Sequence, residues 1–318
     1  MLPAAADVIA AAHRLRGVVE RTPLVRSHAL SAVAGTDVYL KCENLQRTGS
    51  FKLRGAYNAL ITLPASARAR GIVASSAGNH GLGVALSAQL LELRARIFVP
   101  ASAPDVKRDG ILALGAEVDQ SQPHYDDAHH AAVEFAAAHD MTFVSPCAGA
   151  PLLAGQGTVG LEILEELPDV ETIVVPVGGG GLVGGIGALV RAVAPVARIV
   201  GAQSDLTDAM AASLRTGHRV EVATPPTLAD GLAGQIDDEG LAIGQFAIDA
   251  MQLVTEAEIA DAIRWLWREH ALRAEGSGAV GVAAVLSPHR ERMRGPIAVV
   301  VSGGNIDPSR WNAIITGS

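Results

Sequence analysis

A lysine near the start of an expected helix has the position of a nucleophile that attacks carbonyl groups. Lys52 lies in the string SFKLRG (residues 50–55), and we expect a helix to begin near Phe51 with Ser50 or Thr48 as its cap. An amine in the first turn of a helix lies near the positive end of the helix dipole, which favours its neutral, nucleophilic form. By itself the pattern has low specificity, because a lysine in a helix is usually a solvated surface charge.

A run of four glycines forms the second chemical feature. It follows the apolar string TIVVPV and opens an expected helix, and it comprises Gly178, Gly179, Gly180 and Gly181, followed by Leu182. Consecutive glycines allow backbone N–H groups to converge on an anion at a helix N-terminus, so the turn predicts a phosphate site. The spacing also matches the G-x-G-x-x-G dinucleotide fingerprint. A dinucleotide site favours an acidic residue at the end of the next strand, where this chain has Gln203 and, two residues on, Asp205.

The third feature is the string SSAGNHG (residues 75–81), which also lies between an expected strand and an expected helix. Serine and asparagine side chains beside glycine offer both backbone and side-chain donors, which suit a carboxylate or a phenolate oxygen. An ordinary capped turn explains the same residues equally well.

Short apolar strands alternating with helices must position these three strings. The segments that read as strand, turn and helix are 71–91, 95–118 with a helix across Asp105 to Leu114, and 172–194; strands are also expected within 36–45, 197–204 and 296–305. Such βαβ units predict a parallel α/β sheet covered on both faces. Ligands bind beyond the carboxyl ends of parallel strands, so the glycine turns after Ala74, Val177 and Val301 are expected to face one crevice.

Taken together, the three strings resemble the serine and threonine dehydratase family of fold type II pyridoxal-phosphate enzymes, which also contains serine racemase. GSFKLRGA is similar to the family's cofactor-lysine motif, SAGNHG to its substrate-carboxylate loop, and VGGGGL to its phosphate cup. The resemblance covers nearly the whole chain. It implies an α/β fold of two open twisted parallel-sheet domains with the cofactor in the cleft between them. Residues 1–45 plus 148–318 would form the large cofactor-binding domain, and 46–147 the small domain.

The resemblance also implies roles for single residues around pyridoxal 5′-phosphate. Lys52 would be catalytic and hold the cofactor as a Schiff base, while Phe51 packs on one face of the ring and Gly231 on the other. Asn79 would bind the phenolate oxygen. The substrate-binding loop would comprise Ser76, Ala77, Gly78, Asn79 and His80.

At the far end of the ring, the resemblance places Ser302 at the pyridine nitrogen and Glu275 nearby. A hydroxyl cannot hold that nitrogen protonated as a carboxylate would, so the ring is a weak electron sink. A weak sink favours expulsion of a β-leaving group once the Cα proton departs, with Lys52 as the general base and, by resemblance, the cofactor phosphate as the acid. The expected reaction converts L-threonine or L-serine to a 2-keto acid and ammonia.

Several other functions share these motifs. The enzyme alternatives are serine racemisation, dehydration of 3-hydroxyaspartate and a dehydratase step in hydroxyectoine breakdown. A non-catalytic phosphate-binding or nucleotide-binding module is the alternative from another class, and it predicts a colourless protein. Ala77 matches the family's dehydratases, whereas serine racemases carry a serine there as the acid of the opposite face. Gln203 stands where many members have a cation-binding glutamate, so a metal site is doubtful and its presence stays unknown.

Composition limits the partners of the chain. The net charge of −8 over 318 residues disfavours a nucleic-acid partner, and no apolar run reaches membrane-spanning length. The N-terminal segment reads as an amphipathic helix rather than a signal peptide. The two cysteines, Cys42 and Cys147, form no disulfide framework and are expected to pack as small hydrophobic residues. We expect a cytoplasmic enzyme acting on a small amino acid and, by resemblance to the family, a homodimer.

Overall fold

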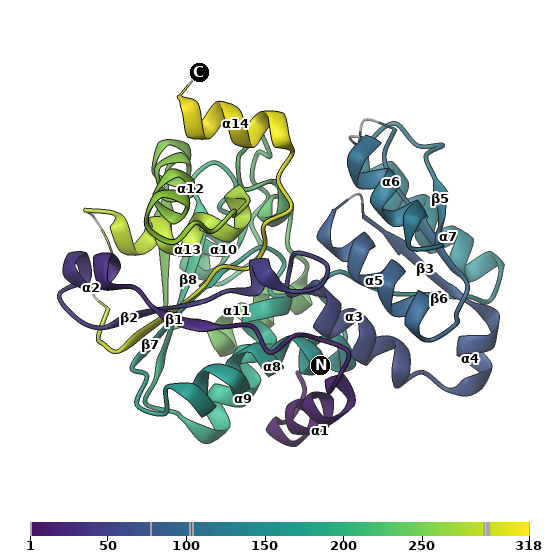
Figure 1. The fold of residues 1–318 in the computed structure, drawn as a ribbon. Coiled ribbons are helices and arrows are strands. Elements are labelled where there is room, and N and C mark those ends of the chain that lie inside the picture. Colours follow the sequence, from purple (N-terminus) through teal and green to yellow (C-terminus); the bar gives the residue numbers. More distant parts are fainter. Residues whose placement is uncertain are drawn as a thin grey trace.

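The protein folds into two parallel β-sheets, each flanked by helices and lying side by side (Figure 1). In this computed structural model the described residues are 2–76, 78–101, 103, 105–288, 290 and 293–317. The predicted α/β fold of two parallel-sheet units is confirmed, and one short antiparallel strand at the edge of the larger sheet is added to it.

The larger sheet has six strands, and all neighbouring pairs are parallel except the first. In spatial order the strands are β1 (Leu24–Arg26), β2 (Val38–Lys41), β10 (Ile297–Val300), β7 (Thr172–Pro176), β8 (Arg198–Ser204) and β9 (Ala250–Val254). Side chains of β7 alternate between two cores: Ile173 and Val175 join one cluster, and Val174 joins the other. A strand buried on both faces has this pattern, because successive side chains point to opposite sides of the sheet.

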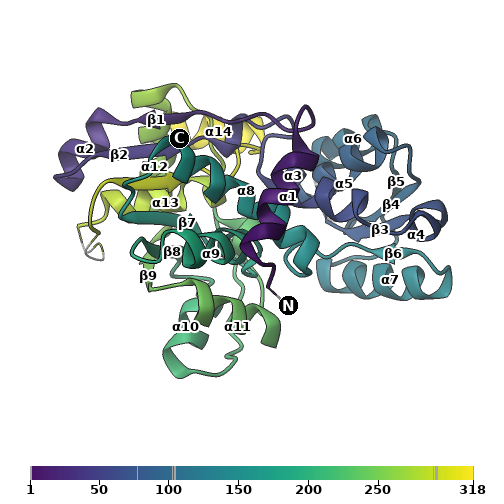
Figure 2. The same cartoon turned by 90° about the horizontal axis from the view of Figure 1, so that it is seen from below.

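Helices cover both faces of the larger sheet. One group, built around contacts among its own members, comprises α1 (Ala5–Leu15), α8 (Ala150–Glu166), α9 (Gly181–Val193), α10 (Ala209–Thr216) and α11 (Asp238–Ala247). In Figure 2, α10 and α11 lie at the bottom of the view, below α9. The other group comprises α2 (His28–Ala34), α12 (Glu256–His270), α13 (Gly276–Leu286) and α14 (Pro308–Thr316).

The smaller sheet has four parallel strands. In spatial order they are β5 (Glu117–Asp119), β4 (Ala95–Phe98), β3 (Ile72–Ser75) and β6 (Thr142–Phe143). Its helices are α4 (Ala65–Arg70), α5 (Asn79–Leu90), α6 (Asp105–Ala113) and α7 (Tyr125–Ala138). The helix α3 (Lys52–Ile61) contacts both α5 and α8 and so joins the two units. The helix α3 thus packs against both units. The expected domain boundaries near residues 46 and 147 stay a prediction.

The expected cap of α3 is wrong. The helix begins at Lys52, its N-cap is Phe51, and no side chain caps it. The hydroxyls of Thr48 and Ser50 have no hydrogen-bond partner among the described atoms. Backbone bonds hold this turn instead: the Phe51 N–H donates to the Ser302 carbonyl at 3.2 Å.

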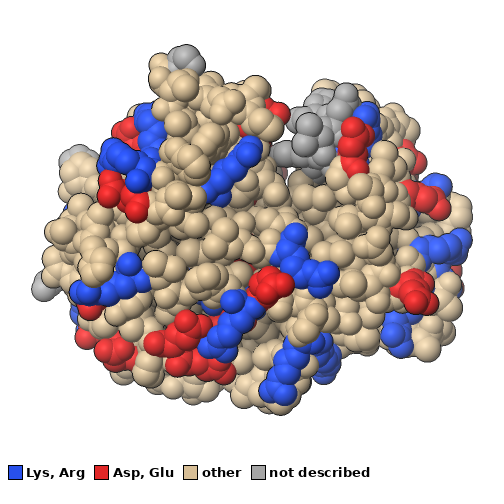
Figure 3. All heavy atoms as spheres, viewed as in Figure 1, with Lys and Arg blue, Asp and Glu red and all other residues tan. Residues whose placement is uncertain are grey.

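Basic and acidic side chains interleave on the face of the molecule seen in Figure 3, rather than forming one continuous basic surface. Within the described part of the chain, no helix combines the length and the apolar character needed to cross a bilayer.

Candidate active site

Lys52 provides a half-buried amine at the start of α3. Its Nζ donates a hydrogen bond to the carbonyl of Pro146 at 2.8 Å. Desolvation by burial lowers the pKa of Lys52, and Cys147 and Glu275 oppose this shift. A lowered pKa increases the fraction of neutral amine at neutral pH, as a nucleophile or a general base requires.

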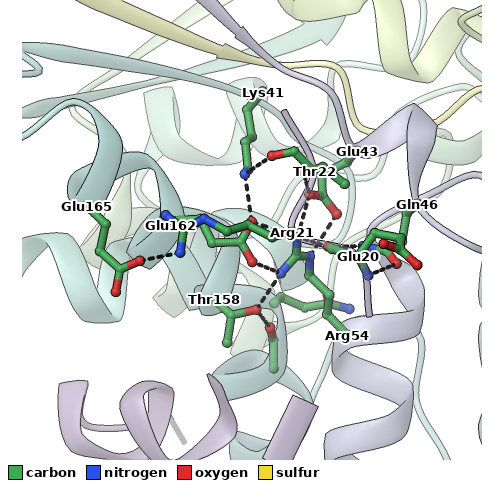
Figure 4. A network of polar contacts seen from close by, with 12 residues as sticks. Glu20, Arg21, Thr22, Lys41, Glu43, Gln46, Arg54, Thr158, Glu162 and Glu165 are labelled. Atoms are coloured by element: carbon green, nitrogen blue, oxygen red, sulfur yellow. Dashed lines mark hydrogen bonds and ion pairs between the residues drawn. The ribbon is translucent and has the colours of Figure 1, made fainter. Parts of the chain in front are cut away.

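A buried cluster of charges anchors the beginning of α3 two residues beyond this lysine (Figure 4). The guanidinium of Arg54 donates to Glu43 at 2.8 Å and to Glu162 at 2.7 Å, and Lys41 lies 2.6 Å from Glu162. Lys41 and Arg54 are fully buried. Two cations balance two carboxylates here, which offsets the cost of removing the charges from water and ties α3 to α8 and to the end of β2.

The four predicted glycines form a tight turn between β7 and α9. Gly180 has φ +94°, a conformation that favours glycine, and Gly181 begins α9. A Cβ at Gly179 would lie 2.8 Å from the sulfur of Cys147, and one at Gly178 would lie 3.0 Å from Leu232. The turn therefore places glycine N–H groups at the N-terminus of α9, at positions where a side chain would collide with Cys147 or Leu232. Leu182 follows as a buried residue of α9.

The predicted substrate loop connects β3 to α5. The Ser76 hydroxyl accepts a hydrogen bond from the N–H of Gly78, and a Cβ at Gly78 would meet nothing within 4 Å. Asn79 is the first residue of α5, and its side-chain nitrogen donates to Glu275 at 2.6 Å. Ala77, the remaining predicted residue of this loop, lies outside the described residues.

His80 of the same loop is buried. Its Nε2 lies 3.0 Å from the carbonyl of Val144, and its Nδ1 has no partner among the described atoms. Burial, assisted by the nearby charge of Lys52, lowers the pKa of His80 to about 3. The ring is therefore neutral at physiological pH and donates from Nε2 to the carbonyl, with Nδ1 as an acceptor.

Three more predicted residues lie around the N-terminus of α13. Glu275 is the N-cap of this helix, and its N–H donates to the Gly303 carbonyl at 3.1 Å. The Ser302 hydroxyl donates to the carbonyl of Ser277 at 3.4 Å, and the N–H of Gly231 donates to the Ser277 hydroxyl at 2.9 Å. Gly231 itself is exposed in the short helix η2 (Asp230–Leu232). Ser277 thus connects Gly231 with Ser302.

A family model described as "Pyridoxal-phosphate dependent enzyme" matches residues 15–303. The chain belongs to this family. Pyridoxal phosphate is therefore its cofactor.

Relatives of this pyridoxal-phosphate enzyme match almost its full length. It is 45% identical over 310 residues to the L-threonine ammonia-lyase of Thermotoga maritima, covering 97% of this chain and 77% of that protein. It is 37% identical to the catabolic L-threonine dehydratase TdcB of Escherichia coli K12, covering 97% and 94%. Among solved structures, maize serine racemase has a TM-score of 0.93 at 30% identity, covering 100% and 98%. Processed threonine deaminase isoform 2 of Solanum lycopersicum has a TM-score of 0.91 at 34% identity, covering 98% and 86%.

The described residues of the enzyme suit this cofactor. Lys52, an amine with a lowered pKa, would attach to the aldehyde carbon. Backbone N–H groups of the turn at Gly179 and Gly180 would hold the phosphate, and the N–H of Asn79 that is not donated to Glu275 would serve an oxygen of the ring. Within the described part of the chain, no group of three or more His, Cys, Asp and Glu side chains could hold a metal ion. Gln203 is buried, and its side-chain oxygen accepts a hydrogen bond from Ala211.

Two residues beside the enzyme's cleft were missed by the sequence reasoning. Cys147 was expected to pack as a small hydrophobic residue, but it is half-buried against Gly179 and electrostatically coupled to Lys52. Asn305 donates to the side-chain oxygen of Asn79 at 2.7 Å. Cys147 belongs to no motif, so nothing in the sequence pointed to it; Asn305 ends the string SGGN, but its partner lies 226 positions away.

Proposed function

We propose that this enzyme is a dehydratase that converts a small hydroxy amino acid, L-threonine and/or L-serine, to a 2-keto acid and ammonia. The observation that carries the proposal is the identity of 45% and 37% to an L-threonine ammonia-lyase and an L-threonine dehydratase over 97% of the chain. Lys52, the glycine turn (residues 178–181) and the asparagine loop (residues 75–81, with Asn79) support it.

The residues proposed to bind the cofactor come from both units. Lys52 is the proposed catalytic residue and cofactor attachment point, and Ser76, Ala77, Gly78, Asn79 and His80 are proposed for the substrate. The residues proposed to hold the cofactor are Phe51, Lys52, Asn79, Gly178, Gly179, Gly180, Gly181, Leu182, Gly231, Glu275 and Ser302.

When bound, pyridoxal phosphate draws electrons from the Cα atom of the amino acid and weakens its Cα–H bond. Lys52 Nζ, whose pKa is lowered by burial, accepts the Cα proton. The Ser302 hydroxyl, which donates to the carbonyl of Ser277 at 3.4 Å, would donate its one hydrogen to the pyridine nitrogen instead, without placing a negative charge beside it. Loss of the β-hydroxyl is then favoured over reprotonation at Cα.

A screen for keto-acid release tests the proposal. The enzyme loaded with cofactor is incubated with L-threonine, L-serine and 3-hydroxyaspartates, and 2-keto acid and ammonia are measured. We expect turnover of L-threonine or L-serine. Release of keto acid from hydroxyaspartate alone would refute the proposed substrate class and favour the 3-hydroxyaspartate alternative.

Serine racemisation is the second candidate, because maize serine racemase matches the whole chain with a TM-score of 0.93. Racemisation needs an acid opposite Lys52 that returns a proton to Cα, and the methyl group of Ala77 cannot supply one. We therefore expect D-serine at no more than a few per cent of the rate of pyruvate formation. Chiral chromatography of the reaction with L-serine measures both products, and equal rates would favour the racemase.

We also propose that the enzyme is a cytoplasmic homodimer with a small domain over residues 46–147. Light scattering coupled to size-exclusion chromatography would give a mass twice that of the chain. A monomeric mass at working concentration would contradict the assembly without affecting the proposed reaction.

A further inference from the structure

Asn305 lies where three parts of the chain meet: the segment after β10, the segment before α3 and the start of α5. It follows β10 in the string SGGN, whose backbone runs against the segment that carries Lys52: the Gly304 N–H donates to the Gly49 carbonyl at 2.9 Å. The half-buried side chain of Asn305 reaches Asn79 at the start of α5. We propose that Asn305 is a positioning residue, which fixes the orientation of the Asn79 amide so that its nitrogen serves the cofactor.

The hydrogen bonds of Asn305 have a fixed direction. Its side-chain nitrogen donates to the backbone carbonyl of Thr48 at 2.7 Å and to the side-chain oxygen of Asn79 at 2.7 Å. The oxygen and nitrogen of an amide are assigned from their partners. A backbone carbonyl only accepts, so the atom of Asn305 that faces Thr48 must be the nitrogen.

This direction is passed on to Asn79. Because both N–H groups of the Asn305 nitrogen are used, the Asn79 atom that faces it must be the oxygen. The other end of the Asn79 amide is then the nitrogen, which donates to the Glu275 carboxylate at 2.6 Å. The Thr48 carbonyl, the two amides and the Glu275 carboxylate thus form one chain of hydrogen bonds. Each donor in it meets an acceptor only when both amides have this orientation.

The chain of hydrogen bonds leaves one N–H of Asn79 for a ligand. An amide nitrogen carries two hydrogens, and Glu275 receives one of them. A Cβ at Gly303 would lie 3.1 Å from the Asn79 nitrogen, so this nitrogen adjoins the segment that carries Ser302, another residue proposed to hold the cofactor. The inference rests on the proposed role of Asn79 in binding the phenolate oxygen, and it assigns to Asn305 the orientation on which that role depends.

The side chain of Asn305 is also confined by its surroundings. Gly49 has φ +72°, and a Cβ there would lie 2.3 Å from the Asn305 oxygen. Because Gly49 has no side chain, there is room beside it for the side chain of Asn305. A substitution of the same shape can change the donors of Asn305 while keeping its packing.

Asn305→Asp is the decisive variant, because a carboxylate of equal shape accepts hydrogen bonds but does not donate them. We expect Asn79 to rotate its nitrogen toward the new carboxylate and its oxygen toward Glu275, which removes the donor from the cofactor. Titration of the cofactor-free protein with pyridoxal phosphate should give a Kd at least about tenfold higher than that of the unmutated protein. The absorption of the bound cofactor should move to shorter wavelength, as expected when the phenolate loses a hydrogen bond.

Two further variants separate orientation from packing. Asn305→Ala releases Asn79 without reversing it, so its Kd should lie between those of the unmutated protein and Asn305→Asp. Asn312→Asp, which places the same charge on an exposed position of α14, is the matched control and should leave affinity and spectrum unchanged. Equal losses in Asn305→Ala and Asn305→Asp would indicate packing alone and overturn the inference.

A double variant tests the reversed chain directly. In Asn305→Asp the rotated Asn79 oxygen faces the carboxylate of Glu275, and Glu275→Gln supplies a donor to that oxygen. The double variant should regain part of the thermal stability lost in Asn305→Asp while the spectrum stays shifted. Unchanged affinity and spectrum in Asn305→Asp would overturn the inference alone, whereas an unmutated protein that takes up cofactor but releases no keto acid would overturn only the proposed reaction.

Discussion

At the residue scale, the proposed chemistry depends on one amine. Lys52 combines three conditions of a nucleophile: a position at the N-terminus of α3, partial burial, and a pKa lowered by desolvation. Its Nζ donates to the backbone carbonyl of Pro146, which is uncharged and does not stabilise the protonated form as a carboxylate would. The amine is thus available for a carbonyl ligand.

Lys52→Ala should abolish both turnover and the visible absorption of the lysine-bound cofactor, because no other amine is expected at the aldehyde carbon. The fold should remain intact, since the Arg54 cluster that anchors α3 is untouched. Absorption spectra, circular dichroism and mass spectrometry after borohydride reduction measure these effects. A reduced cofactor adduct on the variant would place the attachment point at another lysine.

The sequence indicated the residues that follow strands but not the bonds between them. Lys52, Asn79 and the glycines were found because each belongs to a local string whose chemistry can be read without the fold. The contacts of Asn79 join it to residues 196 and 226 positions away, and such contacts depend on packing that no local pattern encodes. The incorrect cap of α3 has the same origin, since Ser302 supplies the carbonyl that orders this turn.

At the element scale, the proposed site draws its loops from the carboxyl ends of strands. β3 leads into the asparagine loop, β7 into the glycine turn, and β10 into the segment that contains Ser302 and Asn305. The short apolar strands and their glycine turns predicted these elements because parallel strands are buried on both faces. The strand β1 was not predicted: three residues, only one of them half-buried, carry little periodic signal.

The glycine turn can be tested at Gly180, where φ is +94° and a Cβ would lie 3.2 Å from Ile243. Gly180→Val should raise the Kd for pyridoxal phosphate by at least about tenfold, because the strained backbone turns its N–H groups away from the phosphate. Gly217→Val is the matched control: its φ is +77°, but nothing lies within 4 Å of its Cβ. Both variants should lose stability, and only the first should lose affinity. Normal affinity in Gly180→Val would show that this turn does not bind the phosphate.

At the scale of the whole molecule, two sheets lie side by side, and α3 packs against helices of both units. Its contacts with α5 and α8 explain why composition revealed no domain boundary: the connection between the units is a packed helix rather than a polar linker. The charge cluster of Arg54, Glu43, Glu162 and Lys41 lies at this connection. Groups buried at the connection therefore influence the stability of the entire fold.

The buried imidazole of His80 should make the stability of the molecule depend on pH. Its pKa is lowered to about 3 in the folded chain, while an unfolded histidine has a pKa of about 6.5. Between these values the unfolded state binds one more proton, so the free energy of unfolding falls as the pH decreases, by about 1.4 kcal/mol per pH unit. From pH 8 to pH 5 this single group should lower the free energy of unfolding by about 2 kcal/mol.

His80→Gln keeps a donor for the Val144 carbonyl and removes the titration, whereas His13→Gln replaces an exposed histidine as the control. Urea unfolding at both pH values should show a smaller decrease in His80→Gln than in the other two proteins. Equal decreases in the free energy of unfolding of all three proteins would mean that folding does not lower the pKa of His80.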